Sequence, residues 1–306
     1  MALILRSIWN YTFYLFNEYK DPRNEHYPLL GSPFPILGII AVYLYFVNSL
    51  GPRSMENRKP FEAQRLINVY NIAQVLINLF IGIVGLKYSY LQPDFSLRCQ
   101  PIDHKTTPER MILLKICYGF LLSRMFDLLD TIFFVLRKRY RQITFLHKYH
   151  HAGIVMGAYV FNKFMAGSHS VLLGIVNSWV HVFMYGYYFL TSFKPELKES
   201  IWWKKHITQL QLIQFVILFI HFGLPIFYSD CSHPKALLFI AAIQNLFMLV
   251  LFADFYIKAY IKKPQTVRSD KSSIKVYLSS AANFNSSPQL SEDKISSTIL
   301  TLQDEI

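Results

Sequence analysis

Long apolar stretches alternate with short polar ones along most of the chain. A helix needs about 20 mostly apolar residues to cross the core of a bilayer. Seven stretches approach or exceed that length, although the first and fourth are short or weakly apolar: residues 34–50, 66–86, 111–136, 150–167, 170–190, 207–228 and 235–260. The pattern predicts an all-α, polytopic membrane protein with seven transmembrane helices, whose first span also serves as the insertion signal.

Composition agrees with a membrane protein. Of the 306 residues, 53% are hydrophobic and 16% are charged, whereas soluble domains carry about 25% of charged residues. A net charge of +12 could suggest a nucleic acid partner, but the basic residues flank apolar stretches and form no separate basic domain. We therefore expect no nucleic acid partner, and expect these charges to meet membrane lipid and phosphate-bearing substrates.

The distribution of Lys and Arg predicts the orientation of the chain, because basic loops are retained on the cytosolic side. With a lumenal N-terminus and seven spans, most basic residues fall in cytosolic segments, among them residues 137–148 and the chain from Lys258 onward. The C-terminus is then cytosolic. Three segments are expected: a lumenal N-terminal segment, 1–33, a transmembrane domain, 34–262, and a disordered, Ser-rich cytosolic tail, 263–306.

The same orientation places two of the three cysteines in lumenal loops, an oxidising compartment. We predict a disulfide between these two, Cys99 and Cys231. Two free loop thiols remain the alternative, because a sequence carries no distance test. Cys117 falls inside the third span, and Asn10-Tyr11-Thr12 is a glycosylation sequon on the lumenal side.

Polar residues inside the predicted spans are costly in a bilayer and are therefore functional candidates. At about 100° per residue, Arg124, Asp127, Asp130 and Thr131 share one face of the third span. A structural ion pair between Arg124 and Asp127 is the plain alternative, and it is compatible with a functional role. One arginine cannot neutralise two carboxylates, so we expect a histidine as a further partner.

Three histidines follow at the mouth of the fourth span. His147, His150 and His151 lie within about 100° of each other on one helical face. A lone histidine is more often a packed core residue, but three at this spacing, of only ten in the chain, indicate a functional site. They also offer the partner that the acidic face of the third span requires.

Further polar stripes occur on three other spans. Asn177, His181, Met184 and Tyr188 line one face of the fifth span. The second span carries Asn68, Asn71, Gln74 and Asn78, and the sixth carries Thr208, Gln211 and Gln214. Polar faces on several helices indicate a shared polar cavity, although polar ladders between packed helices are an equal alternative for the individual Asn and Tyr residues.

Four ordered motifs resemble those of the ELO fatty-acid elongases, the membrane 3-ketoacyl-CoA synthases of very-long-chain synthesis. His147-Lys-Tyr-His150-His151 is similar to the family's HxxHH box, and Arg124-Met-Phe-Asp127-Leu-Leu-Asp130-Thr131 is similar to its KxxExxDT box. The other two motifs are Asn177-Ser-Trp-Val-His181-Val-Phe-Met184-Tyr185-Gly-Tyr187-Tyr188 and Thr208-Gln-Leu-Gln211-Leu-Ile-Gln214-Phe215. The resemblance runs from about Gly51 to Tyr260, and it implies seven helices around an acyl tunnel that opens to the cytosol.

Two departures from the family pattern stand out. Arg124 and Asp127 occupy the positions of Lys and Glu, which keeps the charges but changes the reach and geometry of the pair. The chain ends in Gln303-Asp-Glu-Ile306 rather than in the dilysine signal of many relatives. A location in the endoplasmic reticulum membrane is therefore expected from the reaction and not from an address signal.

The resemblance implies an acyltransferase that condenses a long-chain acyl-CoA with malonyl-CoA, giving a 3-oxoacyl-CoA two carbons longer, CoA and CO2, without a cofactor or a metal. His150 would accept the acyl group and His181 would assist condensation. His147 and His151 would orient or polarise, while Asp127 and Asp130 would fix tautomers. The substrate-binding residues would be Arg124, Asn177, Tyr185, Tyr188, Gln211, Gln214 and, at the CoA phosphates, Lys204, although topology-setting surface charge explains Lys204 equally well.

Two other functions fit parts of the pattern. Histidine-box di-iron desaturases and hydroxylases also carry HxxHH motifs, but they need about eight clustered histidines, and this chain has one cluster plus His181. A non-catalytic lipid carrier would use the same cavity without needing the histidine box. Partners implied by the elongase reading are acyl-CoA, malonyl-CoA, membrane lipid and the other enzymes of the elongation cycle.

Overall fold

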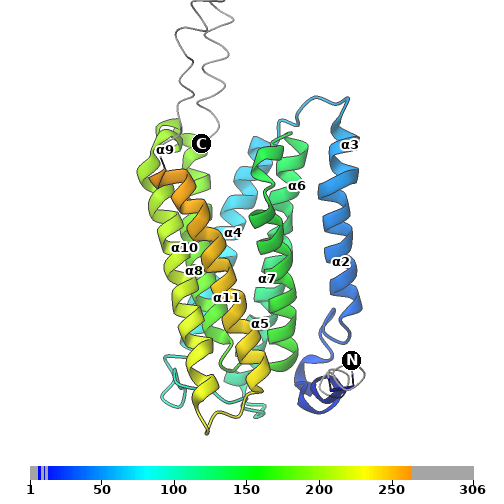
Figure 1. Cartoon of the computed structure of the whole chain (residues 1–306), viewed down its shortest axis with the longest axis vertical. Coiled ribbons are helices and arrows are strands. Elements are labelled where there is room, and N and C mark those ends of the chain that lie inside the picture. Colours follow the sequence, from blue (N-terminus) through cyan, green and yellow to red (C-terminus); the bar gives the residue numbers. More distant parts are fainter. Residues whose placement is uncertain (1–5, 8–9, 11–12, 263–306) are drawn as a thin grey trace, which may run out of the picture. The chain divides into compact units, whose positions relative to one another are not determined.

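The computed structural model describes residues 6–7, 10 and 13–262, and this part of the chain contains helices and turns but no strand (Figure 1). Its contacts divide the chain into two units, Met1–Phe252 and Ala253–Ile306. The main helices are α2 (Phe34–Tyr45), α3 (Gly51–Met55), α4 (Gln64–Lys87), α5 (Pro108–Phe126), α6 (Leu128–Leu136), α7 (Phe145–Phe164), α8 (Val171–Phe193), α9 (Pro195–Glu199), α10 (Ile201–Gly223) and α11 (Lys235–Tyr256). The fold is all-α, as predicted.

Four helical segments of the described chain are long and apolar enough to cross a membrane: Phe34–Met55, Gln64–Lys87, Ile201–Phe227 and Lys235–Ile261. They correspond to the first, second, sixth and seventh predicted spans. The helices at the other three predicted spans, α5 with α6, α7 and α8, carry the ionisable and polar motifs, which lower their mean hydropathy. The chain is thus a polytopic membrane protein, and the count of seven spans stays a prediction.

Local sequence signals place the helix ends that matter for the motifs. The hydroxyl of Thr144 accepts a hydrogen bond from the backbone N–H of His147 at 3.2 Å and caps the N-terminus of α7. The histidine motif therefore occupies the first two turns of that helix. The predicted third span, 111–136, is in fact two helices, because the chain leaves the helical pattern at Asp127, between α5 and α6.

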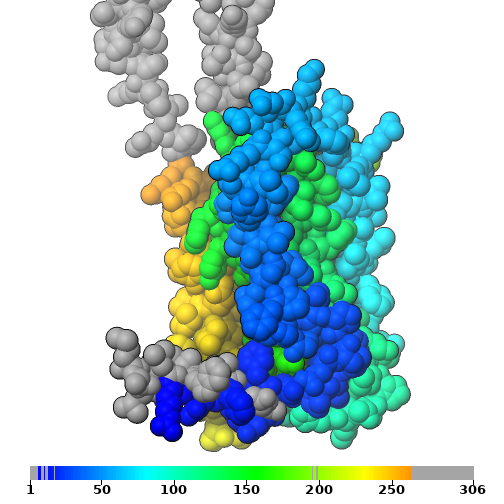
Figure 2. Space-filling model, turned by 90° about the vertical axis from the view of Figure 1, so that its right-hand side faces the viewer, coloured from blue at the N-terminus to red at the C-terminus, as the bar shows by residue number. Residues whose placement is uncertain are grey.

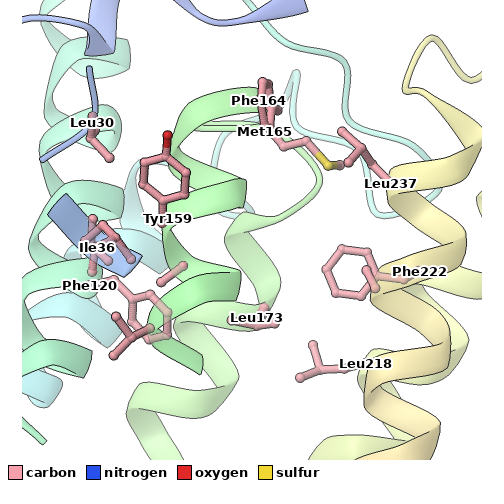
Figure 3. Close-up of a cluster of buried hydrophobic side chains, with 14 of the residues drawn as sticks. Leu30, Ile36, Phe120, Tyr159, Phe164, Met165, Leu173, Leu218, Phe222 and Leu237 are labelled. Atoms are coloured by element: carbon pink, nitrogen blue, oxygen red, sulfur yellow. The ribbon is translucent and has the colours of Figure 1, made fainter. Parts of the chain in front are cut away.

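The helices of the first unit share one apolar core. Figure 3 shows Phe120 of α5, Tyr159 of α7 and Leu173 of α8 in this core, together with Leu218 and Phe222 of α10. A glycine allows the close approach of α4 and α8. A Cβ atom on Gly82 would lie 3.1 Å from the indole nitrogen of Trp179, so only a glycine fits there without displacing the tryptophan.

One end of this unit is held together by a disulfide, and we call it the disulfide end. Cys99 and Cys231 form the pair predicted from the sequence, with Cα atoms 5.8 Å apart. Next to it, the imidazole Nε2 of His233 lies 2.7 Å from the carbonyl oxygen of Gln100. Burial lowers the pKa of His233, which keeps the ring neutral and suited to this bond. The disulfide and this bond both tie the chain before α5 to the chain before α11.

The opposite end carries the loop 137–144 and the loop between α3 and α4, and we call it the basic end (Figures 1 and 2). Within the first unit, Figure 2 shows α2 running along the outside between the two ends. The predicted tail, 263–306, and part of the Asn10 sequon lie outside the described residues. The predicted boundaries at residues 33 and 262 stay predictions.

Removal of the disulfide is expected to lower the stability of the protein. Replacing both cysteines should lower it no further than replacing either one. Cys99→Ala and Cys231→Ala each open a loop of sequence separation 132, which costs about 2–5 kcal/mol. Each single variant and the double variant should therefore share one lowered thermal midpoint in detergent. Losses that add in the double variant would contradict a shared bond, and Cys117→Ala serves as the control.

Candidate active site

A buried arginine is the centre of the polar interior. The side chain of Arg124 is completely shielded from solvent. Its guanidinium donates to the side-chain oxygens of Asn177, at 2.9 Å, and of Asn78. It also donates to the hydroxyl of Ser123 at 2.9 Å and lies over the ring of Phe120. The arginine thus gathers side chains from α4, α5 and α8.

Asp127 is the counter-ion of this arginine. Its Oδ2 lies 3.0 Å from the Arg124 guanidinium, and both side chains are almost fully buried. Its Oδ1 accepts hydrogen bonds from the amide of Gln74 at 2.5 Å and from the hydroxyl of Tyr185 at 3.3 Å. The Arg124–Asp127 pair predicted from the spacing is therefore present, and further hydrogen bonds stabilise the carboxylate.

His181 is the histidine that joins this pair. Arg124 lies 2.5 Å from its Nδ1 and 2.9 Å from its Nε2, and Nδ1 is 3.5 Å from Asp127. A guanidinium can only donate, so the ring nitrogen that takes its bond is unprotonated. The sequence predicts that the histidines at 147–151 bind the carboxylates of the third span. For Asp127 this prediction is wrong, because the histidine beside it is His181 of α8.

The second carboxylate, Asp130, is bound by a tyrosine. The hydroxyl of Tyr185 donates to Asp130 Oδ2 at 2.6 Å. The same hydroxyl reaches Asp127, so Tyr185, which is fully buried, bridges the two acids. Tyr70 of α4 adds a hydroxyl 3.4 Å from that of Tyr185. Phenol donors take the place of the second cation that two carboxylates would otherwise require.

The three histidines of α7 have different surroundings. His147 Nε2 lies 2.8 Å from the hydroxyl of Thr131, and the rings of His147 and His151 are 4.2 Å apart. His151 is buried, and its Nδ1 has no hydrogen-bond partner in the described chain. His150 is half-buried, makes no hydrogen bond in the described chain, and faces the rings of His151 and Phe252. His150 is therefore more exposed than His151, and its imidazole makes no hydrogen bond in the described chain.

The histidine motif and the arginine are connected by contacts between helices. Arg124 contacts His181 of α8, and His147 of α7 contacts Thr131 of α6. The two motifs are far apart in sequence, but α7 packs against α5 and α8 packs against α4 and α10. The structure thereby brings the predicted residues of the third, fourth and fifth spans to one region of the bundle.

Some predicted residues lie at the margin of this network. Gln214 is buried and accepts a hydrogen bond from the Asn177 amide at 3.3 Å. Gln211 contacts the sulfur of Met184. Tyr188 is 44% exposed and contacts the ring of Tyr185. Lys204 lies in the first turn of α10 at the basic end, where its carbonyl accepts from the hydroxyl of Thr208.

Other members of the network are not identified by the motifs. Gln74 and Asn78 belong to a stripe that the sequence indicates only as polar lining, yet they bind Asp127 and Arg124 directly. Tyr43 of α2 also joins the network, with its hydroxyl 2.8 Å from that of Thr131. No sequence signal marks it, because a tyrosine in an apolar span resembles an interface anchor. In the part of the chain that the structure describes, no group of three or more His, Cys, Asp or Glu is placed to hold a metal ion.

Comparison with known proteins gives a consistent result. A sequence profile of the GNS1/SUR4 (ELO) family matches residues 28–268. Very long chain fatty acid elongase 7 of Drosophila melanogaster is 37% identical over 261 residues, covering 85% of this chain and 78% of the relative. Very long chain fatty acid elongase 1 of Homo sapiens is 36% identical over 253 residues, covering 82% and 90%. Very long chain fatty acid elongase 7 of Rattus norvegicus is 38% identical over 247 residues, covering 79% and 86%.

The buried ion pair generates a testable double-mutant cycle. Arg124→Met leaves Asp127 as an unpaired buried charge, and Asp127→Leu does the same to Arg124, so each should lose about 3–5 kcal/mol of stability. The double variant should be more stable than either single variant, because neither charge remains. Thermal midpoints in detergent measure the effect, with exposed Arg53→Met as control. Additive losses would mean that the two side chains do not interact.

Proposed function

The chain belongs to the GNS1/SUR4 (ELO) family, and from this premise we propose that it is the condensing enzyme of fatty-acid elongation. Its substrates are a long-chain acyl-CoA and malonyl-CoA. Its products are a 3-oxoacyl-CoA two carbons longer, CoA and CO2. In enzyme terms it is a very-long-chain 3-oxoacyl-CoA synthase, an acyltransferase that acts without a cofactor.

One observation carries the proposal. His181 of α8 contacts a buried arginine, which a carboxylate and two amides also bind, and His147 of α7 contacts Thr131, which follows Asp130. Condensation needs a group that accepts an acyl chain, and donors for the oxygens that become negative. A lipid carrier needs a cavity but neither of these. The arrangement therefore fits a reaction better than simple binding.

The reaction is assigned to two half-steps. The unprotonated nitrogen of His150 attacks the thioester carbon, the C–S bond breaks, and the CoA thiolate takes the N–H proton of the acyl-imidazolium that forms. Malonyl-CoA then loses CO2, and the electron pair of the broken C–C bond forms a new C–C bond with the acyl carbon. The C–N bond to His150 breaks, and the departing ring nitrogen takes up a proton from solvent, which restores the neutral imidazole.

The neighbouring residues support these steps through hydrogen bonds. His147 and His151 lie beside His150 on α7 and orient it or polarise the thioester. His181, bound by Arg124, assists the condensation step, and Asn177 supplies an amide near the developing enolate oxygen. Asp127 and Asp130 hold Arg124 and Tyr185, so they act by keeping this frame in place.

A small apolar cavity, with space for about one water-sized group, lies where the end of an acyl chain could extend. Its volume is about 30 Å³, and its lining comes from α4, α5, α7, α8 and the turn before α8. Phe120 lines it and also lies under the guanidinium of Arg124, with 4.9 Å from the guanidinium carbon to the ring centroid. The cavity thus adjoins the reaction centre and lies on its disulfide-end side. We assign it to the distal part of the acyl chain.

The basic end offers a place for the CoA phosphates. A concavity of about 580 Å³ is lined by Lys59, Arg137 and Arg139, with one acid, Glu62. Burial, and after it the charge of Arg139, lowers the pKa of Arg137, which reflects a cation short of anionic neighbours. Phosphate oxygens would supply the missing charge. Lys204 lies at the same end, in α10.

The proposed location is the endoplasmic reticulum membrane, with a lumenal N-terminus and a cytosolic C-terminus. A disulfide at one end of the bundle and a basic loop at the other agree with an oxidising lumen and a cytosolic face. The other enzymes of the elongation cycle are expected as functional partners. The di-iron alternative is not favoured, because the cation of Arg124 contacts His181 directly and would repel a metal there.

Elongation activity tests the proposal directly. Microsomes that express this chain should convert acyl-CoA and labelled malonyl-CoA into a product two carbons longer, and His150→Ala should abolish it, because no acyl acceptor remains. His206→Ala, an exposed histidine on α10, is the matched control and should keep full activity.

Two other outcomes would contradict different parts of the proposal. A folded wild-type protein that elongates no acyl-CoA would refute the proposed reaction. Elongation that survives in His150→Ala would refute the acyl-histidine step but leave the reaction standing.

The cavity assignment predicts a change in product length. A Cβ on Gly174 would lie 3.7 Å from the ring of Phe120, so the methyl groups of Gly174→Val would occupy the cavity. Products should shift towards shorter chains, as measured by chromatography of the labelled acids. Gly186→Val, on the same helix but facing open space, should leave the length unchanged. Equal products from both variants would place the acyl chain elsewhere.

A further inference from the structure

The first long helix, α2, contributes one buried polar side chain. Most of this helix faces outward, with Val42 69% and Tyr45 60% exposed, and Figure 2 shows it along the outside of the first unit. Tyr43, between them, is only 5% exposed. An insertion signal requires no buried phenol at this position, so the placement of its hydroxyl needs another explanation.

That hydroxyl begins a chain of hydrogen bonds to the histidine motif. Tyr43 Oη lies 2.8 Å from Thr131 Oγ1, and Thr131 Oγ1 lies 2.8 Å from His147 Nε2. Thr131 is fully buried, so water does not compete for these bonds. Two helices that share no motif, α2 and α7, are thus connected through one threonine of α6.

The direction of this chain follows from counting protons. If His147 Nε2 were protonated, it would donate to Thr131, and Thr131 would donate to Tyr43. The phenol proton would then have no acceptor, since Tyr43 makes no other hydrogen bond in the described chain, and a buried unpaired donor is costly. In the opposite direction, Tyr43 donates to Thr131 and Thr131 donates to His147, and the one unpaired donor is then the Nδ1–H of His147, whose side chain is half-buried. This direction is favoured because it leaves no donor unpaired on the buried phenol.

The consequence is a defined tautomer. His147 Nε2 accepts, so the neutral ring carries its proton on Nδ1. The ring packs against His151 at 4.2 Å, and His151 adjoins His150 at 5.5 Å. His147 then has an N–H donor available for the thioester oxygen or the departing thiolate. We propose that Tyr43 is a positioning residue of the active site, which fixes the tautomer of His147 through Thr131.

Contacts just past the C-terminal end of α2 hold this helix at the required distance from α6 and α7. A Cβ on Gly51, just past α2, would lie 2.7 Å from a methyl group of Val135, so α3 and α6 approach more closely there than any other residue type would allow. Lys148 of α7 donates to the side-chain oxygen of Asn48 at 2.6 Å. Both contacts lie beside the Tyr43–Thr131–His147 chain and secure the first span against α6 and α7.

The inference rests on the proposed function and is tested with the full-length enzyme. Tyr43→Phe removes only the hydroxyl, and kcat should fall about tenfold, the effect of losing one hydrogen bond, while KM for acyl-CoA stays within about twofold. Tyr45→Phe on the same helix is the matched control and should resemble wild type. Thr131→Val should lower kcat similarly, and Thr131→Ser, which keeps a hydroxyl, should recover it.

A double variant separates positioning from general destabilisation. Because Tyr43 acts through Thr131, Tyr43→Phe combined with Thr131→Val should be no slower than Thr131→Val alone. The pH profile of kcat should shift in Tyr43→Phe, as His147 loses its fixed tautomer, while the thermal midpoint changes little. A variant that merely loosened the fold would lower the midpoint and leave the pH profile in place.

Several results would overturn the inference. An unchanged kcat in Tyr43→Phe, additive losses in the double variant, or a rise in KM alone would each do so. If Tyr43→Phe does not fold, the comparison of Thr131→Val with Thr131→Ser decides: equal kcat values in these two would refute the role of the hydroxyl chain. A wild-type protein without elongation activity would refute the proposed function instead, which distinguishes the two failures.

Discussion

The arrangement of this bundle depends on the burial of one guanidinium group. An unpaired charge in an apolar interior is prohibitively costly, so a buried arginine must find a counter-ion and hydrogen-bond acceptors. The two terminal nitrogens of Arg124 find them in Asp127 on its own chain segment, Asn78 on α4 and Asn177 on α8. These bonds are directional, so they fix the rotation of α4 and α8 as well as their distance. Apolar packing alone would tolerate several rotations.

The polar interior also explains which helices have the hydropathy of a membrane span. In α7 and α8 the residues that face the reaction centre are histidines, amides and phenols, and this inward face lowers the mean hydropathy of the whole segment. The segment Phe34–Met55, which contains α2, and helix α4 keep apolar outer surfaces and reach the length and hydropathy of a span. Helices α7 and α8 are stable in a bilayer because neighbouring helices cover their polar faces. Their lower hydropathy follows from the polar side chains that they contribute to the reaction centre.

Sequence periodicity predicted the faces of the helices but not how the faces meet. The spacing of three and four residues correctly grouped Arg124 with Asp127 and identified the three histidines as one cluster. It could not predict that His181 would be the histidine beside Asp127, because the relative depth and rotation of two helices are tertiary properties. The interruption at Asp127 gave no signal either, since it contains neither proline nor glycine. Tyr43 was missed because nothing in an apolar helix distinguishes a tyrosine that faces lipid from one that faces inward.

The pairing of Cys99 with Cys231 has a consequence for biosynthesis. The cysteines lie 132 residues apart, so at synthesis rates of about 5–20 residues per second the second thiol follows the first by roughly 7 to 26 s. During that interval α5, α6, α7, α8 and α10 are made and must be inserted. The bond can close only when the chain before α5 and the chain before α11 have reached the same side of the membrane. Its formation therefore marks a chain whose helices α5 to α10 have been threaded correctly, before α11 has to be in place.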